Sequence, residues 1–467
     1  MKKVFFILSL LVCSSVFSQA QNFVLNINST GIKADSIHFQ VFDKKRDFKD
    51  SIVIPFSEKA VVKQKGIMPA GYYRVMADSN MLFELLISEN KKQNLMVTTD
   101  ADANVVFANS EENANCLAYN RQSEIYAGQR AALQKQFTDA QQTMPQYMLQ
   151  TLAQNLMAQD AEIQREDSIY KEKVMAENPG TLLASIIRFS FELPQPPQHY
   201  YQNRGMLMHY YAEHAFDYFA FEDARMITTP MAVYRLREFC GNLLYMQPTE
   251  GARLTDVLLT KAQTSPETYL FFFNWLEKTF GTIGTSYWNE EIYRTMLRNA
   301  LDYKDLTSSK HNACQREYDL LNRNLEGTQI PDFHILWSDD TKTSLYDVES
   351  EYTLLYFQNP DCPTCTEVRG RLAVNEDLNK AIASGRLKVV TIYFEDDEAL
   401  WRRYLAEKAN PNYLHGWDYL NEINSKNLFD LRAIPYMFLL DKDKKVLKKD
   451  ILENEISDYL HHYQLVE

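Results

Sequence analysis

Two cysteines lie three positions apart in QNPDCPTCTEV, residues 358–368, at Cys362 and Cys365. A Cys-x-x-Cys pair serves in three kinds of chemistry: a redox disulfide, half of a zinc site, or a haem attachment point. Haem attachment needs a histidine directly after the second cysteine, and Thr366 stands there instead. The haem interpretation is therefore excluded, and the other two need to be compared.

A zinc site needs four ligands, and the suggestive partner pair elsewhere in the chain is His311 and Cys314, in HNAC. Together with Cys362 and Cys365 they would make a Cys₃His set. However, His311 and Cys314 lie in a helical region, on the other side of a predicted domain boundary. The Cys-x-x-Cys pair directly follows a buried-strand pattern, which favours redox chemistry. We therefore assign no metal ligand and expect no cofactor.

The redox interpretation gives the two cysteines different roles. YTLLYFQ, residues 352–358, is typical of a buried strand, and CPTCTEVRGRLAV, residues 362–374, has a helical pattern. Cys362 would then stand at a helix start, where the helix dipole and free backbone N–H groups favour a thiolate. Cys365 would lie one turn further on, close enough to attack a mixed disulfide at Cys362. Cys362 is the predicted nucleophile and Cys365 the predicted resolving cysteine.

The C-terminal region as a whole alternates strand and helix patterns, which is the context such a pair requires. RLKVVTIYF (386–394) and YMFLLD (436–441) are predicted strands, whereas EALWRRYLAEKA (398–409) and ENEISDYLHHY (453–463) are predicted helices. A strand that leads directly into a Cys-x-x-Cys helix inside a β-α-β pattern is the thioredoxin-type arrangement.

Residues 325–467 resemble the exported thioredoxin-like family that includes the cytochrome c maturation thioredoxins and related thiol–disulfide oxidoreductases. The resemblance rests on IPDF at 330–333, CPTC at 362–365 and AIPYMFLLDKDKKVLKK at 433–449. It implies an α/β thioredoxin-like fold, with Cys362 and Cys365 as the catalytic pair. It also implies that Pro435 is a cis-proline that faces this pair and shapes the substrate groove. Expected partners are cysteine-containing envelope proteins as substrates and a membrane electron donor.

The chain departs from this family at two positions near the cysteines. The family often has a tryptophan directly before the first cysteine, whereas this chain has Asp361, whose negative charge opposes thiolate formation. Thioredoxins also bury an acid on the strand six residues before the nucleophile, and Tyr356 stands there. The usual proton acceptor for Cys365 is therefore missing. These departures leave open a rival interpretation, a non-catalytic binding protein with a vestigial cysteine pair.

Two regions precede the thioredoxin-like one, so the chain is predicted to be multidomain. Residues 21–108 contain short β-branched and aromatic runs separated by turn residues, which predicts a β-sandwich-like domain. Residues 109–322 are predicted to form an α-helical domain, with one long helical pattern that stops at 178–180. With GYY at 71–73 and NSEEN at 109–113, the chain resembles a Bacteroidetes-type protein with an N-terminal β domain and a helical domain of unknown function.

The helical region is rich in Tyr, Phe and Met, which indicates a packed helical core, with a ligand or peptide groove as the alternative. His209 and His214, near Met206 and Met208, have residue types that bind copper. Their spacing of five turns the two histidines to different helix faces, which disfavours that site.

The N-terminus, MKKVFFILSLLVCSSVFSQA, has two lysines, a short apolar run and small residues before Ala20. This pattern predicts a signal peptide over residues 1–20 and a location in the periplasm or cell envelope. A lipoprotein anchored at Cys13 is the alternative, disfavoured because Val12 precedes that cysteine. The net charge of −13 argues against a general nucleic-acid binder.

Disulfides persist in the oxidising compartments that exported proteins enter, so the other cysteines also need an interpretation. Three remain beyond the signal region and the pair: Cys116, Cys240 and Cys314. Because their number is odd, at least one has no intramolecular partner, and a buried, inert thiol is the expected explanation.

Overall fold

The computed structural model describes residues 22–42, 48–66, 68–89, 93–283 and 285–466. The predicted signal peptide, and Cys13 with it, lies outside this part of the chain. Contacts divide the chain into two compact units, the first ending at Leu276 and the second beginning at Glu277. None of the helices in the described ranges is long and apolar enough to cross a membrane.

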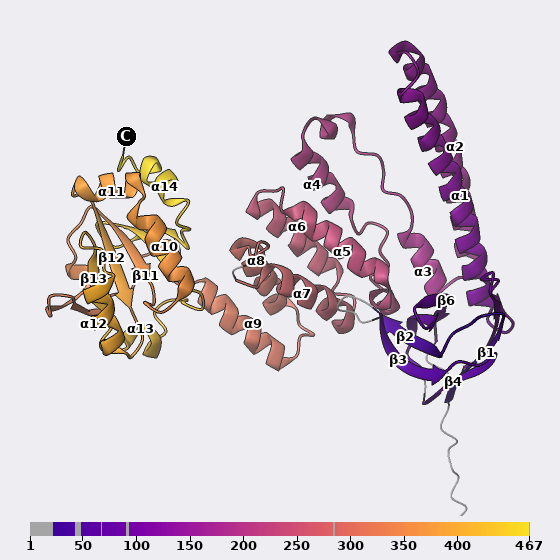
Figure 1. Ribbon diagram of the computed structural model, residues 1–467, viewed down its shortest axis with the longest axis horizontal. Helices are drawn as coiled ribbons and strands as arrows, with labels where there is room; N and C mark the ends of the chain where they lie inside the picture. Colours follow the sequence, from indigo (N-terminus) through magenta and orange to yellow (C-terminus); the bar gives the residue numbers. More distant parts are fainter. Residues whose placement is uncertain (1–21, 43–47, 67, 90–92, 284, 467) are drawn as a thin grey trace, which may run out of the picture. The chain divides into compact units, whose positions relative to one another are not determined.

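The N-terminal part of the first unit is a pair of four-stranded sheets, with strand orders β4-β1-β7-β8 and β3-β2-β5-β6 (Figure 1). Apolar side chains from both sheets share one core, which includes Leu25, Phe39, Val62 and Val75. This is the predicted β-sandwich-like arrangement. The strands are β1 (Asn22–Thr30), β2 (Ser36–Phe42), β3 (Phe48–Pro55), β4 (Lys59–Lys65), β5 (Gly71–Ala77), β6 (Asn80–Ile87), β7 (Asn94–Asp100) and β8 (Val106–Phe107).

Strand β4 lies outside the β-branched and aromatic runs by which the sequence predicted strands in residues 21–108. Its sequence, KAVVKQK, is rich in lysine, and lysine is depleted in strands. In the sheet, β4 is an edge strand that buries Ala60 and Val62 and leaves its lysines exposed. Exposed lysines on an edge strand prevent pairing with other chains, which explains the composition.

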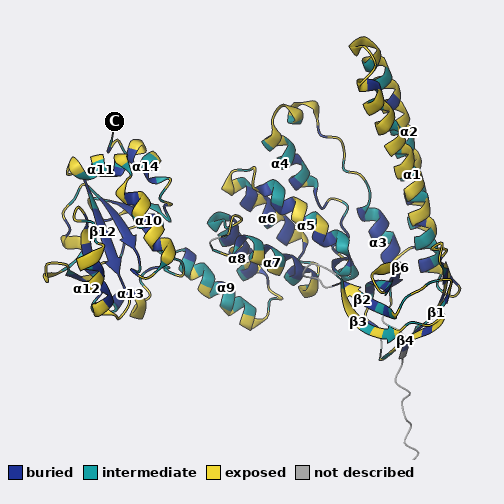
Figure 2. Ribbon diagram, viewed as in Figure 1, coloured by how far each residue is buried: buried dark blue, intermediate teal, exposed yellow. Residues whose placement is uncertain are grey.

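The helical part of the chain begins with a long hairpin formed by α1 (Glu111–Gln141) and α2 (Gln146–Glu177). The NSEEN motif fixes its start, because the Asn113 side chain exchanges two hydrogen bonds with the Leu86 backbone of β6. Helix α2 ends at Glu177, directly before the helix-breaking Asn-Pro-Gly at 178–180, as the sequence predicted. Most of the hairpin surface is exposed (Figure 2).

Shorter helices follow the hairpin and bury the aromatic-rich segments, as predicted for a helical core. Phe216, Phe219 and Phe272 contact one another with ring centroids 5.4–5.7 Å apart. The helices are α3 (Leu182–Phe189), α4 (Arg204–His214), α5 (Pro230–Leu243), α6 (Pro248–Lys261), α7 (Pro266–Phe280), α8 (Glu290–Asp302) and α9 (Ser308–Leu321).

The C-terminal part of the second unit is a seven-stranded sheet of order β10-β9-β13-β12-β11-β14-β15 with helices on its faces (Figure 1). Strands β11, β12 and β13 are parallel, whereas β14 is antiparallel to β11. Alternate residues of β11 supply the two cores, with Leu354 and Tyr356 in one and Leu355 and Phe357 in the other. This mixed α/β sheet is the thioredoxin-like arrangement that the sequence predicted.

The elements of this sheet and its helices have the following bounds. The strands are β9 (His334–Trp337), β10 (Lys342–Ser344), β11 (Tyr352–Phe357), β12 (Leu387–Tyr393), β13 (Leu414–Trp417), β14 (Tyr436–Asp441) and β15 (Val446–Lys449). The helices are α10 (Pro363–Ala373), α11 (Glu376–Ala383), α12 (Glu398–Glu407), α13 (Glu422–Ser425) and α14 (Ile456–His462).

Helices α8 and α9 belong to the same compact unit as this sheet. Arg432 forms an ion pair with Glu317 of α9, and Lys449 lies 2.8 Å from Glu290 of α8. The Lys449 ammonium also donates to the Leu321 carbonyl at the end of α9. The secondary structure changes near residues 322–325, where we predicted a domain boundary, whereas the contacts divide the chain earlier, after Leu276. The predicted domain limits therefore remain predictions.

Candidate active site

The candidate site lies where the central strand β11 passes into helix α10. The connecting loop turns at Asn359, whose side-chain oxygen accepts the Asp361 N–H at 2.8 Å and whose carbonyl accepts the Cys362 N–H at 3.2 Å. Cys362 is the N-cap residue of α10, and Pro363 occupies the first helical position, where a missing N–H costs nothing. The sequence therefore placed Cys362 correctly at the helix start.

The two sulfur atoms occupy different environments. Cys362 Sγ accepts a hydrogen bond from the Cys365 backbone N–H at 3.2 Å, one of the helix-start donors that would otherwise lack a partner. Cys362 is partly exposed, whereas Cys365 is completely buried at 0%. Burial raises the pKa of the Cys365 thiol to about 12, and the contact with Cys362 acts in the same direction. Both cysteines are free thiols here.

The segment before β14 completes the site. The Ile434–Pro435 peptide bond is cis, as the family resemblance implied. Phe357 at the end of β11 pairs with Tyr436 at the start of β14. The loop after β11 and the loop before β14 therefore meet at the same end of these two strands. Cys362 Sγ lies 4.0 Å from the Ile434 carbonyl oxygen. The structure thus brings together the cysteine pair and the segment that carries Pro435.

Tyr356 occupies the position of the buried acid in thioredoxins, and it cannot replace that acid as a proton acceptor. The side chain is fully buried, and its hydroxyl donates to the Cys365 carbonyl at 3.4 Å. Burial raises the pKa of this phenol, so it stays protonated at neutral pH. The charged side chain that acts on the Cys365 thiol is a cation, Arg369, which tends to lower its pKa.

Sequence reasoning did not identify Arg369. Its guanidinium bonds to the Gln358 side chain, donates to the carbonyls of Asn359 and Pro360 at 3.4 and 3.3 Å, and donates to Thr366 Oγ1 at 2.7 Å. A signal existed in the sequence, because position 369 is four residues after Cys365 and therefore on the same face of a helix. It was overlooked because arginine is usual on exposed helix surfaces.

The proposed zinc and copper ligands do not assemble. Among the described residues, no group of three or more His, Cys, Asp or Glu side chains could hold a metal ion. His209 Nε2 lies 2.6 Å from Glu250, and His214 Nδ1 lies 2.6 Å from Asp217, so these histidines have separate acidic partners. Cys314 is buried in α9, and burial raises its pKa to about 11, as expected for an inert thiol.

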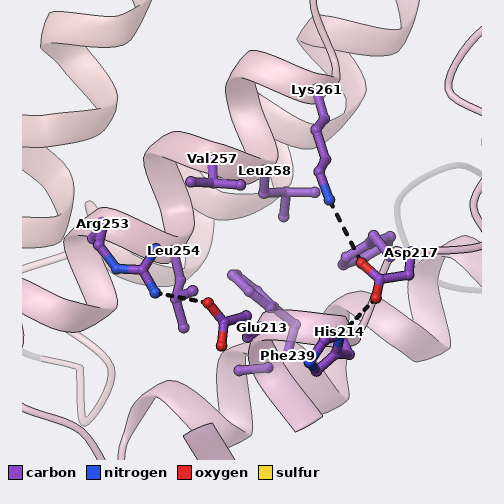
Figure 3. Close-up of a pocket in the computed structure, with 11 residues that line it drawn as sticks. Glu213, His214, Asp217, Phe239, Arg253, Leu254, Val257, Leu258 and Lys261 are labelled. Carbon is purple, nitrogen blue, oxygen red and sulfur yellow. Dashed lines mark hydrogen bonds and ion pairs between the residues drawn. The ribbon is translucent and has the colours of Figure 1, made fainter. Parts of the chain in front are cut away.

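The helical part of the first unit contains a hollow of about 260 Å³ lined by residues of α4, α5 and α6 (Figure 3). Its charged side chains are paired with each other: Arg253 with Glu213 at 3.2 Å, and Lys261 with Asp217 at 3.7 Å. Because these charges are already compensated, we assign no ligand to the hollow.

Comparison with known proteins agrees with the fold of the C-terminal region. Residues 350–446 match a family described as thioredoxin-like. The C-terminal domain is thioredoxin-like. Residues 155–324 match a domain of unknown function, DUF5106, which covers most of the helical region ahead of the thioredoxin-like domain. No curated protein matches the chain.

Solved structures give a similar result. The chain is similar to a thioredoxin-like protein from Bacteroides caccae, with 25% identity and a TM-score of 0.53 over 59% of this chain and 99% of that one. This span is longer than the thioredoxin-like domain. It is also similar to the C-terminal domain of an uncharacterized Bacteroides fragilis protein, with 36% identity and a TM-score of 0.29 over 30% of this chain and 98% of that one.

Proposed function

We propose that this protein is a thiol–disulfide oxidoreductase that uses Cys362 and Cys365 to reduce or exchange disulfides in envelope proteins. The observation that carries the proposal is the position of Cys362 Sγ. It caps α10, accepts the Cys365 N–H and adjoins the Ile434 carbonyl, next to the cis bond to Pro435. A partly exposed sulfur that accepts a helix-start N–H is placed where an attacking cysteine is needed.

In the reducing direction, the Cys362 thiolate attacks one sulfur of a substrate disulfide. A bond forms between Cys362 Sγ and that sulfur, the substrate S–S bond breaks, and the other substrate sulfur leaves as a thiolate that takes up a proton. The Cys365 thiolate then attacks Cys362 Sγ and releases the second substrate thiol. Two electrons have passed to the substrate, and a second dithiol must reduce the remaining Cys362–Cys365 disulfide.

The proposal includes a location and partners. The signal-peptide pattern of residues 1–20 supports the periplasm or cell envelope, where substrate disulfides persist. We propose that the substrates are cysteine-containing envelope proteins that dock beside Pro435, and that a membrane-bound dithiol donor reduces the protein again. The redox potential of the pair decides which direction dominates.

Trapping variants test this function. With Cys365→Ser, the attack that resolves the mixed disulfide is lost, while Cys362 keeps its position at the helix start. This variant should accumulate covalent adducts in the cell envelope that a reductant releases, and mass spectrometry would identify the trapped proteins. The Cys362→Ser variant should form none, because it lacks the attacking sulfur.

A Cys116→Ser variant that retains the pair is the matched control and should turn over disulfide substrates like the wild type. If Cys365→Ser stays folded and forms no adduct under oxidising conditions, the oxidoreductase proposal is wrong. A binding protein with a vestigial cysteine pair would then be the better interpretation.

A further inference from the structure

The proposed reaction requires the Cys365 thiol to lose its proton at a buried position. The thiol is completely buried, which favours its neutral form. The titratable groups that act on it are Cys362, Tyr356 of β11 and the cation Arg369 of α10, and Tyr404 of α12 lies near Tyr356 in turn. Tyr356 and Tyr404 both have pKa values raised by burial, so neither accepts a proton near neutral pH. Asp361, next to Cys362, is exposed.

Arg369 is the cation whose charge acts on this thiol, in the direction that favours the thiolate. It lies one helical turn after Cys365, and four contacts with the Gln358–Pro360 loop and Thr366 fix its guanidinium. The guanidinium carbon also lies 5.2 Å from the ring centre of Tyr404. Tyr404 is 3% exposed and Gln358 is 1% exposed, so both partners of the guanidinium are buried.

Resting on the proposed function, we propose that Arg369 is a positioning residue whose fixed positive charge stabilises the Cys365 thiolate and so permits the resolving step. A cation beside an acidic group favours its ionised form, and the effect is stronger where water is excluded. The positive charge thus performs by electrostatics what a buried carboxylate performs in thioredoxins by accepting the proton. The proton of Cys365 passes to solvent, and no further reactant is needed.

The contacts of Arg369 with the loop suggest a second role, because they also brace the backbone next to Cys362. The two roles can be separated by substitution. Arg369→Lys keeps the positive charge but loses the planar fork that makes several hydrogen bonds. Arg369→Gln loses the charge but keeps a hydrogen-bonding amide. If the charge matters most, the lysine variant should behave like the wild type and the glutamine variant should not.

The first measurement follows resolution in the full chain, using glutathione disulfide as the probe. Attack by Cys362 gives a mixed disulfide with glutathione, and attack by Cys365 then releases the second glutathione. Acid quenching and intact-mass analysis give the rate of this second step. At neutral pH, Arg369→Gln should slow resolution by more than about threefold, because losing the positive charge lowers the thiolate fraction of Cys365. Arg369→Lys should stay within about threefold of the wild type.

The second measurement reports the protonation of Cys365 without requiring activity. The S–H stretching band, obtained by Raman difference spectroscopy against Cys365→Ala, detects the neutral thiol and is free of tyrosine signals. In Arg369→Gln this band should persist to a higher pH than in the wild type. Arg371→Gln is the matched control: Arg371 lies on the same helix but is exposed and pairs with Glu453 at 2.7 Å. It should change neither measurement.

The inference is overturned if the S–H band of Arg369→Gln disappears at the wild-type pH, or if Arg369→Lys resolves as slowly as Arg369→Gln. Failure of the proposed function would look different. In that case the wild-type protein would form no Cys362–Cys365 disulfide with glutathione disulfide, while the Raman titration would still decide whether Arg369 acts on Cys365.

Discussion

At the scale of single residues, the protein separates two chemically identical side chains by exposure. Cys362 can be reached by a substrate, whereas Cys365 is enclosed beneath it. Reduced, folded protein therefore holds a neutral thiol in its core. The folded protein therefore loses stability at high pH, because the unfolded chain releases the Cys365 proton more easily.

This difference predicts how the stability of the reduced protein depends on pH. The Cys365 pKa is raised from an ordinary value of 9.0 to about 12 by burial. Below pH 9 the Cys365 thiol is protonated in both the folded and the unfolded protein, and its contribution to the unfolding free energy is fully present. Between these values the folded state binds more protons, so the unfolding free energy falls as pH rises, by at most about 1.4 kcal/mol per pH unit. Urea unfolding of the reduced wild type and Cys365→Ala should show the steeper fall in the wild type; parallel curves would contradict the assignment.

At the scale of elements, helix α9 supports the loop that faces the cysteines. Glu317 of α9 pairs with Arg432, which Asp430 also holds at 2.6 Å, and Arg432 lies three residues before Pro435. The helical region next to the thioredoxin-like domain therefore contacts the loop that completes the candidate site. Its last helix contributes to the geometry of that loop.

We expect Glu317→Gln to increase the mobility of this loop while changing the free energy of unfolding only slightly. The Glu317–Arg432 pair is partly exposed, so its loss should cost about 1 kcal/mol or less. Hydrogen exchange measured by mass spectrometry should become faster in the peptide that spans residues 428–437. Asp319→Asn, an exposed change on the same helix, is the control and should leave that peptide unchanged. Equal exchange in Glu317→Gln and the wild type would show that α9 does not support the loop.

At the scale of the whole molecule, the chain has two compact units, and the Cys362–Cys365 pair lies in the second unit. Multidomain proteins commonly unfold in more than one step. A change in the redox state of Cys362 and Cys365 should therefore affect one unfolding step and leave the other unchanged.

Calorimetry of the oxidised and reduced protein tests this expectation. Closing the four-residue loop between the cysteines restricts the unfolded chain by about 2 kcal/mol. For a unit of this size, oxidation should raise one transition by roughly 4–8 °C. Cys365→Ser, which cannot form the disulfide, should abolish the shift. If both transitions move together, the two units unfold as one.

The same measurement bears on the direction of the reaction. If oxidation raises the transition temperature, the folded protein favours the disulfide over the dithiol. A pair that favours its disulfide acts as a reductant.

The sequence was sufficient for features that depend on local periodicity and helix-end chemistry. The apolar run of β11 and the proline after Cys362 locate a strand that leads into a helix, and both depend on neighbouring residues alone. Strand β4 was missed because its lysines conceal the two buried residues of an edge strand. The family resemblance implied the cis bond at Pro435, which no local pattern could have indicated.

The surroundings of Cys365 were decided by the tertiary structure. Arg369 and Arg371 are two residues apart on α10 and have the same chemistry. Helical spacing puts Arg369 on the face of Cys365, but it does not say what that face contacts. Packing of Cys365, Val368 and Leu372 against the sheet fixes the rotation of the helix. That rotation directs Arg369 to the Gln358–Pro360 loop and Tyr404, and Arg371 to Glu453 at the surface. The face that a helix buries depends on the elements that pack against it. For α10 those elements are distant in the sequence, so local sequence could not show which arginine would lie in the site.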